Sequence, residues 1–243
     1  IENFNPPFTR TINSQNTVLG VILTELMGLD NFGYLNINSQ SLLARRTYIV
    51  DMQRRFFELI KCLPKIDFFV TLFNSPNVSM IKEVFPNTPV YNLCLWPNYK
   101  TIIPKEYKYD YSFFGTMTPH RTKILNQISK TNSVISKHGI SELDREVLIK
   151  KSKFVLNIPQ NNIWGTISPM RVLSAHNASR LVVNIGTSSG NLPGVFNVKD
   201  AFELERKKSI FNKNIDQFEN YNKNNFNLDD FYALKTHLDI RLA

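Results

Sequence analysis

Residues 152–186 carry the pattern that most constrains the fold of this chain. The segment reads SKFVLNIPQNNIWGTISPMRVLSAHNASRLVVNIG. An apolar run at 154–158 is followed by a polar loop, a helix beginning near Ser168, and a second apolar run at 181–185. Short apolar runs bounded by turn signals are typical of strands covered on both faces. The order of strand, helix and strand therefore predicts a parallel sheet.

Two helix starts in the chain share a hydroxyl residue, a proline and an arginine. Residues 168–171 read SPMR, and residues 118–121 read TPHR after a predicted strand at 111–115. Ser or Thr caps free backbone N–H groups, and Pro fits the first helical turn. An arginine in that turn opposes the helix dipole unless both face an anion. Either copy alone fits a common helix opener with a solvated arginine, but the pair, after strands of one parallel sheet, predicts that Arg121 and Arg171 bind one diphosphate.

The remaining pattern predicts an α/β protein with two lobes of parallel sheets flanked by helices. Residues 96–109 lack periodicity, so we expect an amino lobe at 1–108 and a carboxyl lobe at 109–243. The predicted strands are 34–37, 67–73, 89–95, 111–115, 132–136, 153–158 and 181–185. The predicted helices are 17–29, 41–63, 76–85, 119–130, 142–151, 169–178 and a final amphipathic helix at 228–242, after a loosely ordered segment at 211–227.

The chain is basic, with 29 Lys and Arg against 20 Asp and Glu and a formal net charge of +9. Such a chain can bind nucleic acid, an anionic membrane surface or phosphorylated small molecules, and charge alone does not choose among them. Cys62 and Cys94 stand far apart, so neither a disulfide framework nor a thiolate metal site is expected. Without an 18-residue apolar run or a signal-peptide pattern, we expect a cytoplasmic protein, with attachment to the inner face of a membrane left open.

Three segments together resemble the carboxyl lobe of GT-B glycosyltransferases, of the group-1 and spore-maturation CgeB-like kind. They are YDYSFFGTMTPHRTKIL, ELDREVLIKKSKFVLNI and SPMRVLSAHNASRLVVNIG. In those proteins a strand ending in Phe-x-Gly, an early Arg, a Ser-Lys-x-x-Leu-Asn strand and a Ser-x-x-Arg helix recur in this order. The similarity spans about residues 107–205. It implies an α/β fold of two Rossmann-like lobes, with the amino lobe reduced. The activity that it implies is that of a nucleotide-sugar-dependent hexosyl- or pentosyltransferase whose carboxyl lobe binds the donor and whose amino lobe faces the acceptor.

The resemblance also implies roles for individual residues. Arg171 would be catalytic by stabilising the leaving diphosphate, and no base is assigned. The chain lacks the Asp-x-Asp metal motif and metal-ligand His spacing, so we expect no metal or other cofactor, only a nucleotide-sugar co-substrate, UDP-linked. The residues expected to bind the donor are Gly115, Thr116, Arg121, Lys137, His138, Asn157, Ser168, Met170, Arg171 and Ser174.

Two points stay open at the level of sequence. Many relatives carry Glu where this chain has Ser174, so the donor is not fixed by the resemblance. The acceptor is a nucleic acid such as modified DNA, a glycan or a lipid-linked molecule. The alternative to a transferase is a non-catalytic α/β module that binds nucleic acid or nucleotide, which the basic charge favours.

Overall fold

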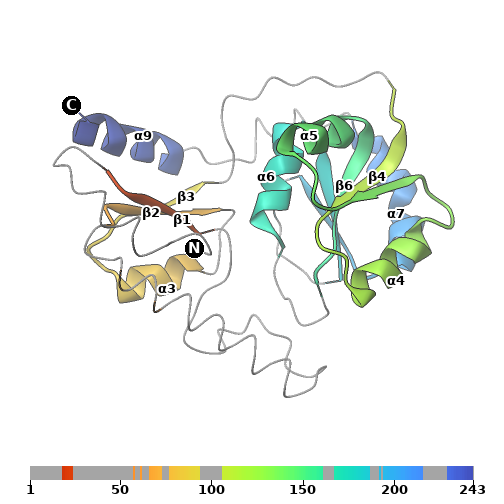
Figure 1. The fold of residues 1–243 in the computed structure, drawn as a ribbon, viewed down its shortest axis with the longest axis horizontal. Coiled ribbons are helices and arrows are strands. Elements are labelled where there is room, and N and C mark those ends of the chain that lie inside the picture. Colours follow the sequence, from red (N-terminus) through yellow and green to blue (C-terminus); the bar gives the residue numbers. More distant parts are fainter. Residues whose placement is uncertain are drawn as a thin grey trace, which may run out of the picture. The chain divides into compact units, whose positions relative to one another are not determined.

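The computed structural model of the chain describes residues 18–23, 57, 61, 66–72, 77–93, 106–160, 167–186, 192, 194–215 and 229–242 (Figure 1). These residues belong to two compact units. The first comprises Ile1–Gly33, Gln40–Cys94 and Asn227–Ala243, and the second comprises Tyr34–Ser39 and Leu95–Phe226. Each unit has its own parallel sheet, so the predicted α/β class is confirmed.

The first unit contains a sheet in the order β1-β2-β3, all parallel. Its elements are β1 (Gly20–Leu23), β2 (Phe68–Leu72), α3 (Asn77–Val84), β3 (Val90–Leu93) and α9 (Asp229–Leu242). Figure 1 shows α3 and α9 on opposite faces of this sheet. Two hydrogen bonds hold α9 on β3, because Asp230 Oδ2 accepts from the Asn92 N–H at 2.9 Å and His237 Nδ1 lies 3.0 Å from the Tyr91 hydroxyl. The sequence places the final helix with the carboxyl lobe, whereas in the structure it packs on the first unit.

The helix predicted at 17–29 is wrong at Gly20–Leu23, which forms β1. Glycine and β-branched residues disfavour a helix here, and Gly20 pairs with Phe68 across the sheet. A Cβ on Gly20 would lie 2.2 Å from the Phe68 ring, so any larger residue here would displace that ring. Val18 and Leu19 are not helical either, and the remaining residues of that predicted helix lie outside the described residues, as does the strand at 34–37. The helix at 41–63 also lies outside them, apart from two helical residues, Phe57 and Lys61.

The second unit has a five-stranded parallel sheet in the order β5-β4-β6-β7-β8. Its strands are β4 (Tyr109–Phe114), β5 (Val134–Lys137), β6 (Ser152–Asn157), β7 (Leu181–Ile185) and β8 (Val195–Val198). Its helices are α4 (Pro119–Ile128), α5 (Glu142–Lys150), α6 (Pro169–Asn177) and α7 (Ala201–Lys213). Figure 1 shows α5 and α6 on one face of the sheet and α4 and α7 on the other. The predicted alternation of strands and helices from 111 to 185 is confirmed within a few residues at each end.

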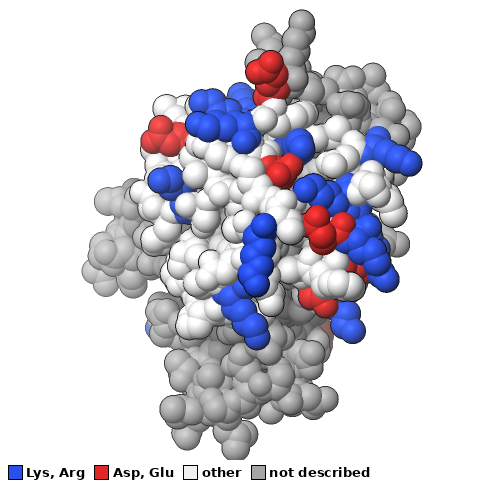
Figure 2. Space-filling view, turned by 90° about the vertical axis from the view of Figure 1, so that its right-hand side faces the viewer, with Lys and Arg blue, Asp and Glu red and all other residues white. Residues whose placement is uncertain are grey.

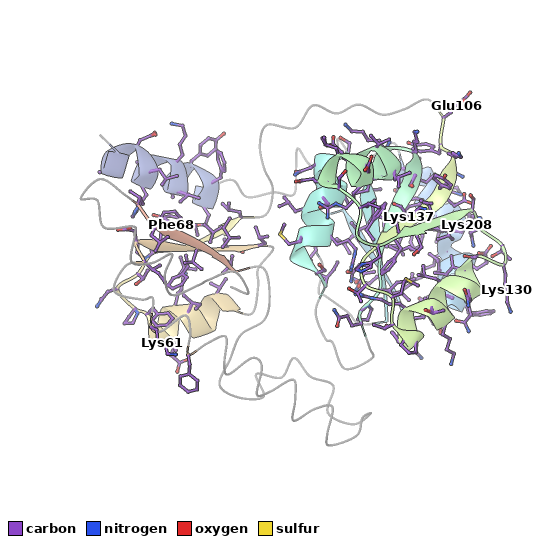
Figure 3. All side chains as sticks on the ribbon, in the orientation of Figure 1. Lys61, Phe68, Glu106, Lys130, Lys137 and Lys208 are labelled. Carbon is purple, nitrogen blue, oxygen red and sulfur yellow. The ribbon has the colours of Figure 1, made fainter. Side chains whose placement is uncertain are left out.

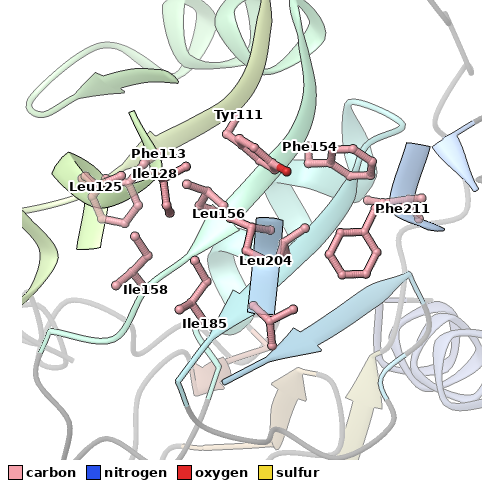
Figure 4. Packing of buried hydrophobic residues seen from close by; sticks show 13 residues of the cluster. Tyr111, Phe113, Leu125, Ile128, Phe154, Leu156, Ile158, Ile185, Leu204 and Phe211 are labelled. Atoms are coloured by element: carbon pink, nitrogen blue, oxygen red, sulfur yellow. The ribbon is translucent and has the colours of Figure 1, made fainter. Parts of the chain in front are cut away.

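The core of this unit fills the space between the sheet and the α4–α7 layer. Tyr111, Phe113, Phe154 and Leu156 point from β4 and β6 toward this layer, which contributes Leu125, Ile128, Leu204 and Phe211 (Figure 4). Alternate residues of β6 face opposite sides of the sheet, and Val155 is also fully buried, on the other face. Because both faces are covered, the strands are the continuous apolar runs seen in the sequence.

The sequence misses the last two elements of this unit, β8 and α7. The loose structure predicted at 211–227 is wrong at its start, because Phe211 lies in α7 and is only 3% exposed. Phe211 stacks on Phe196 of β8 with 4.7 Å between ring centroids. The two aromatic rings thus complete the core. The Asn- and Lys-rich composition of this part of the sequence did not indicate the two elements that carry them. Residues 216–227 lie outside the described residues.

Basic side chains are dispersed over the face shown in Figure 2, where Asp and Glu stand among them. Several form ion pairs, such as Lys153 with Asp110 at 2.8 Å and Lys207 with Glu203 at 2.7 Å. Such exposed or partly exposed pairs add little to stability, because water screens the two charges. Within the described part of the chain, no helix combines the length and the apolar character needed to cross a membrane.

Candidate functional site

The two predicted helix starts lie at the carboxyl end of the second sheet but differ in their caps. Thr118 caps α4, because its hydroxyl oxygen accepts from the Arg121 N–H at 3.3 Å. The same hydroxyl donates to the Gln160 carbonyl oxygen at 2.7 Å, which ties the β4–α4 loop to the segment after β6. The cap predicted at Ser168 is wrong, since its hydroxyl accepts no N–H of α6 among the described residues. Instead the Ser168 N–H donates to Asn157 Oδ1 at 3.4 Å.

Arg121 is buried, with 5% of its surface exposed. Its Nε donates to the Ile158 carbonyl oxygen at 2.9 Å, and its Nη1 donates to the Thr116 carbonyl oxygen at 2.7 Å. Burial lowers the pKa of Arg121. This arginine therefore braces the loop after β4 against the end of β6, and part of its hydrogen-bonding capacity is used inside the protein.

Arg171 is half-buried and reaches from the first turn of α6 to two strand ends. Its Nε and Nη2 donate to the Phe114 carbonyl oxygen at 3.3 and 3.0 Å, and its Nη1 donates to Asn157 Oδ1. Burial, and then the nearby charge of Arg121, lower the pKa of Arg171. Its orientation is therefore set by the backbone of β4 and by one side chain of β6.

The two guanidinium groups meet beside Gly115. Each lies over the Phe113 ring, with the carbon of the Arg121 guanidinium 5.2 Å and that of Arg171 5.1 Å from the ring centroid. A Cβ on Gly115 would lie 3.0 Å from Arg171 Nη2 and 3.5 Å from Arg121 Nη1. The structure thus brings together the two arginines that the sequence analysis singled out, at the residue that ends the Phe-x-Gly strand.

Within the described part of the chain, no acidic side chain neutralises the positive charge of this pair. The acceptors are backbone carbonyls and the Asn157 amide oxygen, and no Asp or Glu among the described residues pairs with either guanidinium. Two like charges held close together and partly away from water destabilise each other, whereas an anion between them relieves both. The arrangement is suited chemically to bind an anion such as a phosphate group.

Arg180 shows what a purely structural arginine looks like in the same unit. It is 2% exposed and donates to the carbonyl oxygens of Ser152, Ser179 and Lys150 at 2.8, 2.8 and 2.6 Å. Its guanidinium carbon lies 5.2 Å from the Tyr107 ring centroid. Ser152 is the first residue of β6, so Arg180 binds the amino end of this strand. Arg121 and Arg171 instead contact its carboxyl end. Burial lowers the pKa of Arg180.

The other predicted site residues divide into exposed and buried groups. Thr116 and Met170 are exposed near the arginine pair, and Ser174 is half-buried one turn further along α6. Lys137, labelled in Figure 3, ends β5 and pairs in register with Phe114 of β4. The side chains of Lys137 and His138 are both exposed. Asn157 is 1% exposed and lies behind Arg171, so its amide faces protein groups.

Sequence reasoning missed two residues that connect to this site, Asn184 and Asn197. Asn157 Nδ2 donates to Asn184 Oδ1 at 2.7 Å, and Asn184 Nδ2 donates to Asn197 Oδ1 at 2.8 Å. All three asparagines stand near the carboxyl end of an apolar strand: Asn157 in FVLNI, Asn184 in LVVNI and Asn197 in VFNV. That repeated position was the available signal, because carboxyl ends of parallel strands share one edge of the sheet.

The chain is a two-unit α/β protein with two arginines at the carboxyl edge of one parallel sheet, and comparison with solved structures places this fold in the GT-B class. The structure is similar to a TarM variant from S. aureus crystallised with fondaparinux, α-GlcNAc-glycerol and UDP, at a TM-score of 0.53 and 10% identity over 98% of this chain. TarM is a GT-B glycosyltransferase. The present chain covers 53% of the TarM chain, and at this identity the likeness shows the fold alone.

Comparison of sequences adds one relative. The chain is 31% identical over 130 residues to an uncharacterised protein of Acanthamoeba polyphaga mimivirus, a match that covers 48% of this chain and 40% of that protein. No family model matches the chain. The chain thus spans well under two thirds of the length of the proteins it resembles.

Proposed function

We propose that this chain is the nucleotide-sugar-binding part of a glycosyltransferase, and that Arg171 with Arg121 holds the diphosphate of the donor. The observation that carries the proposal is the convergence of two unneutralised guanidinium groups on Gly115, at the carboxyl end of a parallel sheet. Ligands of open parallel sheets bind beyond this edge. The GT-B fold of the chain supports a sugar-transfer reaction over other uses of a phosphate site.

The chemistry follows from where charge develops. In glycosyl transfer the bond between the sugar carbon and the diphosphate oxygen breaks, and the bond electrons leave with the diphosphate. Arg171 is the better placed of the pair to meet that charge, because it is half-buried whereas Arg121 is 5% exposed. Arg121 adds a second positive charge near the diphosphate and holds the loop after β4 in place. Removing one positioned donor of this kind lowers the rate about 10²–10³-fold. In this proposal the arginines supply the leaving-group stabilisation, and no metal takes part.

The donor and acceptor classes are proposed by comparison. UDP is bound in the TarM complex, so we propose a UDP-linked sugar as the donor here. That complex also contains α-GlcNAc-glycerol, which supports a glycan acceptor over a nucleic acid or a lipid-linked molecule. We assign the acceptor to the amino lobe, residues 1–108, and the donor to the lobe that begins at residue 109.

A thermal-shift screen with nucleoside diphosphates tests this proposal. UDP at saturating concentration should raise the melting temperature, because a ligand that binds only the folded state stabilises it. Arg171→Ala should abolish the shift, whereas Arg206→Ala, which removes the same charge from the surface of α7, should keep it. A shift with duplex DNA and with none of the diphosphates would establish the non-catalytic binding module instead. Release of UDP from a panel of UDP-sugars, followed by chromatography, would then identify the sugar.

A further inference from the structure

Three asparagines stand in register on neighbouring strands of the second sheet. Asn157 on β6 is paired with Asn184 on β7, which is paired with Asn197 on β8. Their side chains form a chain of hydrogen bonds of 2.7 and 2.8 Å, and we call these residues the asparagine ladder. Asn157 is 1% exposed and Asn184 is fully buried. Buried amides cost free energy unless they are hydrogen-bonded, so a ladder within such apolar strands calls for a physical explanation.

Arg171 fixes the direction of every amide in the ladder. A guanidinium group only donates hydrogen bonds, so Asn157 must turn its Oδ1 toward Arg171 Nη1. Its Nδ2 then faces Asn184, which has to accept through Oδ1. Asn184 in turn donates from Nδ2 to Asn197 Oδ1. The ladder is therefore a directed chain with Arg171 at its donor end.

We propose that the asparagine ladder is the positioning element of the anion site and that Asn184 acts as a positioning residue for Arg171 through Asn157. A neutral amide oxygen orients the guanidinium group without neutralising its charge, which a carboxylate in the same place would do. Asn184 holds Asn157 in the one orientation that presents an oxygen to Arg171. The identity of the anion as a nucleoside diphosphate rests on the proposed function, whereas the ladder itself rests on the hydrogen bonds within the sheet.

Loss of the Asn184 amide has a specific consequence for its neighbour. In Asn184→Leu, a change of similar shape, Asn157 Nδ2 loses its acceptor on β7. The Asn157 amide is then held only through its Oδ1, by Arg171 and the Ser168 N–H, so it moves more freely and holds the guanidinium less firmly beside Gly115. The matched control is Asn132→Leu, because Asn132 is also a buried amide but bonds to Ile128 and Glu205 at the far end of α4.

The first experiment measures binding of UDP by isothermal titration calorimetry. We expect Asn184→Leu to weaken UDP binding about tenfold, in the range of one lost charge-assisted hydrogen bond, and Asn132→Leu to bind as the wild type does. Circular dichroism and melting curves establish that both variants are folded. Wild-type affinity in a folded Asn184→Leu protein would overturn the ladder proposal.

A second measurement needs no ligand and separates this proposal from the proposed function. The solvent-exchange rate of the Arg171 Nε–H, measured by NMR on ¹⁵N-labelled protein and assigned with Arg171→Lys, reports how firmly the guanidinium is held. We expect an increase of about tenfold in Asn184→Leu and none in Asn132→Leu. If the wild type binds no nucleoside diphosphate while this rate still rises, the ladder stands and the proposed function fails. An unchanged rate overturns the ladder whatever binds.

The variant Asn184→Asp gives a pH readout that a merely structural role would not produce. A protonated Asp at this position accepts from Asn157 and donates to Asn197, as the asparagine does, whereas the ionised form places a buried negative charge near Arg171. UDP affinity relative to the wild type at each pH should therefore be recovered on the acid side and fall as pH rises. Parallel pH profiles for the two proteins would contradict a role of Asn184 in setting the charge that the anion meets.

Discussion

Arg171 donates two hydrogen bonds to the carbonyl oxygen of Phe114, from Nε at 3.3 Å and from Nη2 at 3.0 Å. The end of β4 and the start of α6 are thereby joined through the group that we propose to bind the donor. The residue after Phe114 is Gly115, so the strand end and the Arg171 guanidinium are adjacent in the structure. Substitutions at the residues around this contact test the arrangement independently.

Replacing Gly115 should displace Arg171. In Gly115→Ala the new Cβ would lie 3.0 Å from Arg171 Nη2, at a backbone φ of +149°. We expect UDP affinity to fall about tenfold or more, together with about 1 kcal/mol of stability from backbone strain. Gly139→Ala is the control, since its φ is +67° and no described atom lies within 4 Å of its added Cβ. Equal losses of affinity in the two variants, by calorimetry, would refute a specific effect on Arg171.

Asn157→Asp should weaken binding without unfolding the protein. The change is nearly isosteric and gives Arg171 an anionic partner in place of the amide oxygen. Because the guanidinium charge is then neutralised internally, we expect UDP affinity to fall about tenfold to a hundredfold. Chemical denaturation should show a folded protein, because the new ion pair with Arg171 offsets the loss of the hydrogen bond donated to Asn184 Oδ1. Undiminished affinity would mean that the unneutralised charge of Arg171 is not what binds the anion.

Arg121 and Arg171 should contribute differently to the free energy of unfolding and to UDP affinity. Arg121→Met leaves the carbonyl oxygens of Ile158 and Thr116 without their donor, and we expect a loss of about 2–4 kcal/mol in the free energy of unfolding. Arg171→Met should cost less stability, because Arg171 is more exposed, but should lose more UDP affinity. Urea denaturation and calorimetry on both variants measure the two effects. The reverse order would place the anion at Arg121.

His176 should make the second unit sensitive to acid. It is fully buried in α6 beside Gly194, and burial lowers the pKa of His176 to about 4. Its unfolded-state pKa is about 6.5, so between those values the unfolded state binds a proton that the folded state does not. Stability should thus fall as pH drops from about 6.5 to 4, by more in the wild type than in His176→Gln. Identical pH dependence of urea midpoints in the two proteins would contradict this burial.

Much of the second unit could be predicted from the sequence because its strands are buried on both faces. Runs such as Phe154–Ile158 and the Thr118 cap depend on local physics and are legible without the fold. The helix assigned at 17–29 fails for the opposite reason: a short apolar run fits both periodicities, and pairing of Gly20 with Phe68 decides the outcome. Elements β8 and α7 were missed because their aromatic residues find partners only in the folded core.

The charged residues of the site could be predicted from the sequence, but the residues that hold them in place could not. The positions of Arg121 and Arg171 in two similar helix starts indicated a shared ligand. What the sequence could not indicate was that both lie over Phe113 and that Asn184 stands behind Asn157, because these contacts join strands distant along the chain. Nor could it show that the acceptors around both arginines are neutral.

A crystal structure of the chain with bound UDP tests the central claim most directly. We predict that the diphosphate lies beside Gly115, at the carboxyl end of β4, and accepts hydrogen bonds from the Arg171 guanidinium while Arg121 keeps its bonds to the protein carbonyls. A nucleotide bound elsewhere on the chain, with Arg171 still held only by Phe114 and Asn157, would contradict the account.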